Sequence, residues 1–122
     1  MSTYKIMIVE DEFIIALAIK SSIEKMGYEV EKSVRTGEEA IQYAADFKPS
    51  LVLMDITLAG TIDGIEAAEQ IQKDLHIPVL FITGNSDQMT LSRAMELHPA
   101  GILIKPVLDT ELERSLEEVF GK

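Results

Sequence analysis

Acidic and basic residues stand directly after several apolar runs of this sequence. Asp11, Asp55 and Lys105 each come at or just after the end of a short run of Ile, Leu, Val and Met. In an open parallel sheet, the ligand crevice lies outside the carboxyl ends of the strands, so side chains at successive run ends can meet in one pocket. Glu10 and Thr83 end apolar runs in the same way. We therefore expect three carboxylates, one hydroxyl and one ammonium group to share a site.

Such a group of side chains suits a divalent cation and a phosphoryl group. Three carboxylates that converge on one crevice repel each other unless a cation is present. Mg²⁺ fits this setting because it takes oxygen ligands and usually combines one or two carboxylates with water and substrate phosphate. Glu12 comes next in the chain, and we interpret it as an acid that complements a helix dipole.

The elements that must position these residues can be predicted from hydrophobic patterning. Five short runs rich in Val, Ile and Leu predict strands that are buried on both faces of a parallel sheet. They cover residues 4–9, 28–34, 51–54, 78–83 and 101–104. Apolar residues at spacings of three and four predict helices between and after them. Examples of these stripes are Ile15, Ile19, Ile23 and Met26; Ile65, Ala68, Ile71 and Leu75; and Leu112, Leu116 and Val119.

Local signals predict where these helices begin and end. The segments Thr36 to Glu39 and Thr110 to Glu113 match the capping-box pattern, and Ser86 is the expected cap of the fourth helix. Gly27 is predicted to end the first helix in the C′ position. The two histidines, His76 and His98, are expected at helix ends without a catalytic role. Strand and helix thus alternate five times, which predicts an α/β fold of the (βα)₅ type with right-handed crossovers.

Composition restricts the class of protein further. The 122 residues predict one domain, and 47% hydrophobic residues are enough for a real core. The absence of cysteine excludes disulfides and thiolate chemistry, and the longest apolar stretch is far too short to span a bilayer. A net charge of −10 argues against direct nucleic-acid binding. We expect a cytoplasmic protein with no membrane insertion.

The sequence resembles a response regulator receiver domain of two-component signalling over essentially its whole length. The stretches that carry the resemblance are 6–12, 51–55, 63–67, 81–84 and 101–106. The distinctive feature is the order Asp11, Asp55, Thr83, Lys105 at spacings of 44, 28 and 22 residues. The resemblance implies a flavodoxin-like three-layer sandwich with strand order 2-1-3-4-5. It also implies one receiver domain over 1–122 with no output module in these residues.

The resemblance also implies a chemistry. Asp55 would accept a phosphoryl group from the phosphohistidine of a sensor histidine kinase or a phosphotransfer protein. Glu10, Asp11, Asp55 and the backbone carbonyl of Thr57 would bind Mg²⁺. Thr83 and Lys105 would contact the phosphoryl group. The protein would then be a signalling domain that assists its own phosphorylation and dephosphorylation, not an enzyme.

The resemblance also leads to expectations about the docking face, the switch and two local backbone features. Relatives dock downstream partners on the face made by the fourth helix, fifth strand and fifth helix. They carry an aromatic residue where this chain has Ile102, so we expect the switch to use the loop from Thr83 to Asp87 instead. The loop after Asp55 contains Gly60, which predicts mobility. Lys105 precedes Pro106 and could form the cis peptide bond found in relatives.

Two alternative functions stay open at this point. A Mg²⁺-dependent phosphohydrolase could also use Asp55 as nucleophile, but such enzymes usually carry a second aspartate where this chain has Thr57. An inactive receiver could act as a docking module alone. A flavin or dinucleotide site is disfavoured because the first run leads into Glu-Asp-Glu and not into a glycine-rich turn.

Overall fold

The computed structural model describes residues 4–84 and 87–121, in which strands and helices alternate as predicted. In chain order the elements are β1 (Lys5–Val9), α1 (Phe13–Lys25), β2 (Glu29–Val34), α2 (Gly37–Phe47), β3 (Leu51–Asp55), α3 (Gly64–Leu75), β4 (Val79–Thr83), α4 (Gln88–Met95), β5 (Gly101–Ile104) and α5 (Asp109–Phe120). Among the described residues, no helix is both long and apolar enough to cross a membrane.

The strands form one parallel sheet in the order β2-β1-β3-β4-β5, which confirms the predicted topology. β2 lies on one side of β1 and β3 lies on the other. The crossover connections therefore leave β1 and β3 in opposite directions. This divergence opens a crevice at the carboxyl ends of these two strands.

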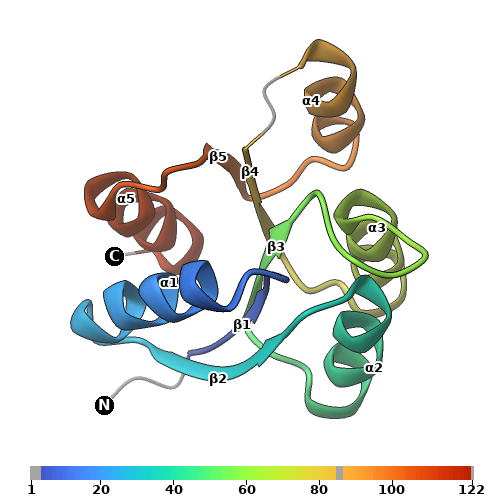
Figure 1. The fold of residues 1–122 in the computed structure, drawn as a ribbon. Coiled ribbons are helices and arrows are strands. Elements are labelled where there is room, and N and C mark those ends of the chain that lie inside the picture. Colours follow the sequence, from blue (N-terminus) through green and yellow to red (C-terminus); the bar gives the residue numbers. More distant parts are fainter. Residues whose placement is uncertain (1–3, 85–86, 122) are drawn as a thin grey trace.

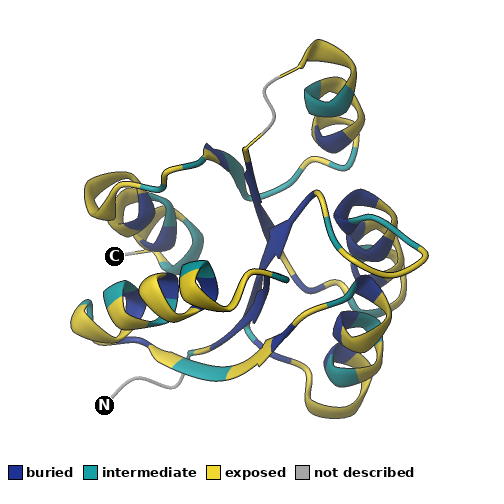
Figure 2. Ribbon diagram, in the orientation of Figure 1, coloured by how far each residue is buried: buried dark blue, intermediate teal, exposed yellow. Residues whose placement is uncertain are grey.

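Helices cover both faces of the sheet and make three layers. α1 and α5 lie on one face, and α2, α3 and α4 lie on the other (Figure 1). Successive strand residues point to opposite faces. Ile6 and Ile8 accordingly pack in the layer with α1 and α5, whereas Met7 and Val9 pack in the layer with α2 and α3. The central strands are buried except at Lys5, the first residue of β1, and the outer faces of the helices are exposed (Figure 2).

The predicted helix boundaries are partly right. The capping box at Thr36 is present: its side chain accepts the Glu39 N–H and Glu39 accepts the Thr36 N–H. Gly27 follows the last turn of α1 with φ +93°, in agreement with the C′ assignment. The prediction for Thr110 is wrong. α5 begins at Asp109, and its N-cap is Leu108, which lies two residues before the predicted cap and makes no side-chain cap hydrogen bond.

The helices after the two site loops are capped by aspartates. Asp63 caps α3 in a reciprocal pair with Glu66. Asp87 caps α4 by accepting the Thr90 N–H, so the cap is not Ser86, which lies outside the described residues. His76 is the C-cap of α3, as expected for a helix end. Asp63 and Asp87 thus fix where the loops after β3 and β4 lead into α3 and α4.

Replacing Thr36 by Ala should lower the free energy of unfolding by about 1 kcal/mol, because the side chain that accepts the Glu39 N–H is lost. Thr110→Ala is the matched control, since Thr110 lies within the first turn of α5 and caps nothing. Its effect should stay below about 0.5 kcal/mol. Urea denaturation of both variants checks this, and equal losses would contradict the assignment of the caps.

Candidate functional site

Strand register brings the predicted site residues to one edge of the sheet. The last pair between β1 and β3 is Val9 with Met54, so Glu10 and Asp55 follow on adjacent strands. Asp55 in turn pairs with Ile82 of β4. These residues therefore lie at the crevice that the strand order opens.

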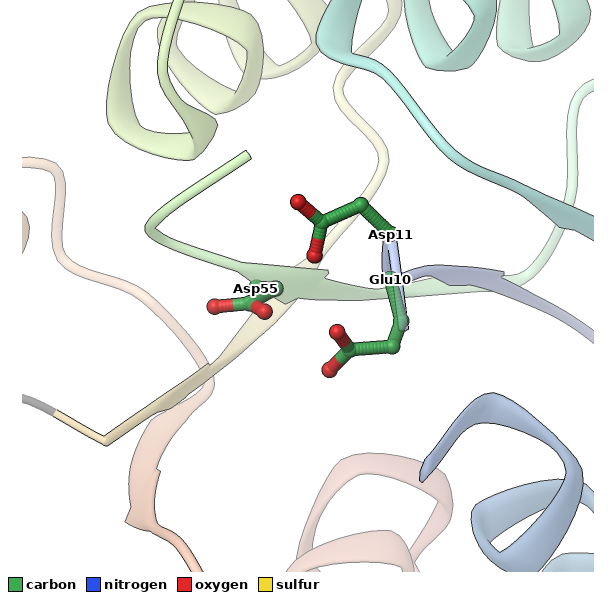
Figure 3. Close-up of side chains that lie close together, drawn as sticks. All are labelled: Glu10, Asp11 and Asp55. Carbon is green, nitrogen blue, oxygen red and sulfur yellow. The ribbon is translucent and has the colours of Figure 1, made fainter. Parts of the chain in front are cut away.

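Three carboxyl groups converge at this crevice. One carboxylate oxygen from each of Glu10, Asp11 and Asp55 lies within 4.8 Å of the others. Figure 3 shows the three side chains facing a common space beside the end of β3. Glu10 and Asp55 are almost fully buried, with 2% and 3% exposed, whereas Asp11 is partly exposed. The predicted acidic cluster is thus present, with Asp11 on its solvent side.

Lys105 joins the cluster from the end of β5. Its ammonium nitrogen lies 2.9 Å from Asp55 Oδ2, to which it donates a hydrogen bond, and 2.9 Å from Glu10 Oε1. Two further donors come from the backbone. The Glu12 N–H donates to Glu10 Oε2, and the Thr57 N–H donates to Asp55 Oδ1. Both buried carboxylates are therefore held in fixed orientations.

Burial sets the protonation of the cluster. Desolvation raises the pKa of Glu10 to about 7, against the opposing effects of Lys105 and the Glu12 N–H, and the charge of Asp55 acts in the same direction as burial. Desolvation alone would lower the pKa of Lys105, but its hydrogen bonds to Asp55 and Glu10 raise it overall. Lys105 therefore stays cationic at neutral pH while Glu10 titrates there.

The cluster fits a hard divalent cation. The donors are carboxylate oxygens, which Mg²⁺ prefers. Glu10 Oε1 is buried, and the ammonium of Lys105 lies 2.9 Å from it. A carboxylate oxygen can accept from Lys105 and still offer a second lone pair to a cation. Asp11 faces the same space from the exposed side. These residues could hold a metal ion.

Most of the predicted site residues, although not Glu10 or Thr83, line an open hollow of about 340 Å³ at this edge. Its lining includes Asp11, Asp55, Thr57, Gly84 and Lys105. The Asp55 carboxylate thus borders a hollow that is open to solvent.

Thr83 ends β4 and is fully buried. It pairs with Ile104, and its carbonyl accepts the Lys105 N–H, so strand pairing ties Thr83 to Lys105. The peptide bond between Lys105 and Pro106 is cis, as the resemblance suggested.

Sequence reasoning missed a steric constraint behind Asp55. A Cβ atom at Gly64 would lie 2.0 Å from the backbone oxygen of Asp55, so no other residue fits there without a shift of the backbone. The Gly64 N–H also donates to the Ile56 carbonyl. The start of α3 thus packs directly on the strand end that carries Asp55. The Asp63-Gly64 pair belonged to the resemblance, but nothing in the local sequence indicated this contact.

A second hollow adjoins the site. It measures about 430 Å³ and lies between α1 and the segment from β5 to α5, with Lys105 in its wall. Most of its lining is apolar, and half of it comes from α1, for example Ile14, Ile15 and Ala18. Beside it, α1 exposes the side chains of Phe13, Ile14 and Leu17, which are 74%, 78% and 53% exposed. The rim of the site on this side is therefore apolar.

The chain matches the family model of the response regulator receiver domain over residues 6–117. It belongs to that family. Receiver domains are signalling domains of two-component systems, so the predicted family and fold are confirmed.

Curated relatives are regulators that are longer than this receiver domain. The phyllosphere-induced regulator PhyR of Methylorubrum extorquens is 35% identical over 84% of the chain, which spans 38% of that protein. The transcriptional regulatory protein PdtaR of Mycobacterium tuberculosis is 30% identical over 93% of the chain, which spans 55% of that protein. The receiver domain thus corresponds to about half or less of these relatives.

Solved structures agree with the fold. The signal receiver domain of a modulated diguanylate cyclase from Desulfovibrio desulfuricans G20 is 37% identical, covers 96% of this chain and 93% of its own, and has a TM-score of 0.90. The N-terminal domain of a response regulator/sensory box/GGDEF protein from Carboxydothermus hydrogenoformans is 31% identical, with coverages of 96% and 94% and a TM-score of 0.86.

Replacing Glu10 by Gln should stabilise the metal-free receiver at about pH 8, by about 1 to 3 kcal/mol. The pKa of Glu10 is raised from 4.5 to about 7 in the folded state. The folded state therefore binds more protons than the unfolded state between these values, and stability falls as pH rises through them. The variant removes this ionisation, so its advantage should nearly vanish at about pH 5. Urea denaturation with a chelator at both pH values checks this, and an equal effect at both would contradict it.

Proposed function

We propose that this receiver accepts a phosphoryl group on Asp55 from the phosphohistidine of a histidine kinase or phosphotransfer protein, in a Mg²⁺-dependent reaction in the cytoplasm. The observation that carries the proposal is a nearly buried carboxylate that contacts Lys105 and borders an open hollow. An Asp55 oxygen would form the O–P bond while the P–N bond of phosphohistidine breaks, and the histidine nitrogen would keep the electron pair of that bond.

Each neighbour has a role in this proposal. Mg²⁺ held by Glu10, Asp11, Asp55 and the Thr57 carbonyl would supply positive charge next to the transferred group. Lys105 would move from pairing with the Asp55 carboxylate to pairing with a phosphoryl oxygen. Thr83 would donate a hydrogen bond from its hydroxyl group to a phosphoryl oxygen.

Phosphorylation would then be signalled through docking of a downstream protein, without direct binding to nucleic acid. The face of α4, β5 and α5 exposes Met89, Met95, Ile104 and Leu108, which gives a partner apolar area to cover. Ile102 is partly buried and packs against the core cluster beneath α2, α3 and α4. We therefore propose that the loop from Thr83 to Asp87 carries the switch; Asn85 and Ser86 lie outside the described residues.

The phosphoryl donor would dock on the α1 side of the site. Its histidine must reach Asp55, so the surface around that histidine must cover the rim of the crevice. The apolar hollow and the exposed side chains of Phe13, Ile14 and Leu17 form that rim on the α1 side. An apolar helix face of the donor would bury this surface, which is a common mode of recognition.

Incubation with acetyl phosphate and Mg²⁺ should add the mass of one phosphoryl group to the natural chain, measured by intact-mass spectrometry. The adduct should be absent from Asp55→Asn and without metal, because the nucleophile or its charge partner is then missing. Asp46→Asn, which changes an exposed aspartate of α2, should label normally. An adduct that persists in folded Asp55→Asn would disprove the assignment. Steady release of phosphate without any adduct would favour a phosphohydrolase.

Replacing Leu17 by Gln should slow transfer from a phosphorylated histidine donor protein that labels the natural chain, by about tenfold or more. The rate with acetyl phosphate should not change, because the small donor needs no docking surface. Phe47→Gln is the matched control: Phe47 is 60% exposed but lies at the end of α2. A loss of rate with both donors, or with both variants, would count against this docking site.

A further inference from the structure

The loop between β3 and α3 is tied to the start of α2. Thr61 donates both its backbone N–H, at 2.9 Å, and its hydroxyl hydrogen to the same Glu38 oxygen, Oε2. These hydrogen bonds hold the pKa of Glu38 below its ordinary value, so the acceptor is ionised at neutral pH. The two residues are 23 positions apart in sequence and belong to different elements.

Two more contacts bring the loop close to α2. Ala59 forms an isolated parallel bridge with Thr36, the N-cap of α2. Gly60 adopts φ +101°, and a Cβ atom there would lie 2.7 Å from Glu38 Oε1. The conformation that glycine permits thus lets the loop backbone approach the carboxylate. Figure 1 shows the loop before α3 passing beside the start of α2.

The same loop begins at the candidate phosphorylation site. Its first turn contains the Thr57 N–H, which donates to Asp55 Oδ1. Between Thr57 and Thr61, the backbone is bridged to Thr36 at Ala59, and the Leu58 side chain packs against the core cluster. The hydrogen bonds from Thr61 to Glu38 anchor the loop beyond these contacts, at its far end.

We propose that Glu38 is a positioning residue, which acts through Thr61 to hold the β3–α3 loop so that the Thr57 carbonyl is presented to Mg²⁺. The inference rests on the proposed function, because it assigns Glu38 to the same metal-dependent reaction. Glu38 itself does not touch the reacting groups. Its loss should weaken Mg²⁺ binding and loosen the loop, while the fold and Asp55 stay in place.

The test compares Glu38→Ala with three matched variants of the full chain. Glu38→Gln removes the charge but keeps an acceptor, and Thr61→Val removes the hydroxyl donor. Glu39→Ala removes an equal charge from the same helix turn and breaks the capping box, but it does not contact the loop. Mg²⁺ affinity is measured by isothermal titration calorimetry without a phosphoryl donor. Amide hydrogen exchange of residues 57–61 is measured by NMR.

We expect Glu38→Ala to bind Mg²⁺ about two- to tenfold more weakly, the loss that corresponds to one or two hydrogen bonds. The Thr61 amide should exchange faster in this variant. Thr61→Val should show part of the loss, and Glu38→Gln should recover most of the affinity. Glu39→Ala should be less stable to urea but bind Mg²⁺ like the natural chain.

The outcomes separate the inference from the function on which it rests. Unchanged affinity in Glu38→Ala, or an equal loss in Glu39→Ala, would overturn the positioning role while phosphorylation of Asp55 could still be observed. A natural chain that binds no Mg²⁺ at millimolar concentration would overturn the positioning role together with the proposed metal dependence. Equal affinities of Glu38→Ala and the Glu38→Ala/Thr61→Val double variant would support a single shared contact.

Discussion

The arrangement of this receiver depends on an imbalance of charge at one edge of its sheet. Three carboxyl groups meet there, and a single ammonium, Lys105, contacts two of them. The imbalance is costly because Glu10 and Asp55 are shielded from water, and the raised pKa of Glu10 expresses that cost. A site of this kind attracts a cation, because added positive charge offsets the repulsion among the carboxyl groups. The rest of the domain must hold the charges together against their repulsion.

The sheet provides this restraint. β1, β3 and β4 are buried on both faces, and parallel pairing fixes the register in which Glu10, Asp55 and Thr83 follow one another. Close-packed interiors yield little to local forces. The start of α3 adds a second restraint, since Gly64 leaves no space between that helix and the backbone oxygen of Asp55. Repulsion therefore changes protonation more readily than it moves the strands.

The residues on the strands could be predicted from sequence, and the contacts between loops could not. Runs of buried β-branched residues locate strand ends, and parallel topology places those ends together, so Asp55 and Lys105 were found from pattern alone. Helix caps were predicted less well, because Thr110 matches a capping box that the chain does not use once the helix begins at Asp109. The bond between Glu38 and Thr61 had no local signal. Gly60 suggested a mobile loop, whereas its conformation admits a contact with a carboxylate of α2.

α4 differs from the other helices in how little holds it to the core. Ala94 is its one buried residue, and its side-chain link to α3 is the partly exposed ion pair between Arg93 and Asp63, at 3.2 Å. Exposed pairs of this type contribute about 0 to 1 kcal/mol. Local opening free energies vary widely within one domain, and elements with few buried contacts lie at the low end. A protein that binds α4 would therefore meet little resistance from contacts between α4 and the core. Through the pair of Arg93 with Asp63, such a protein would also act on the N-cap of α3, which ends the loop between β3 and α3.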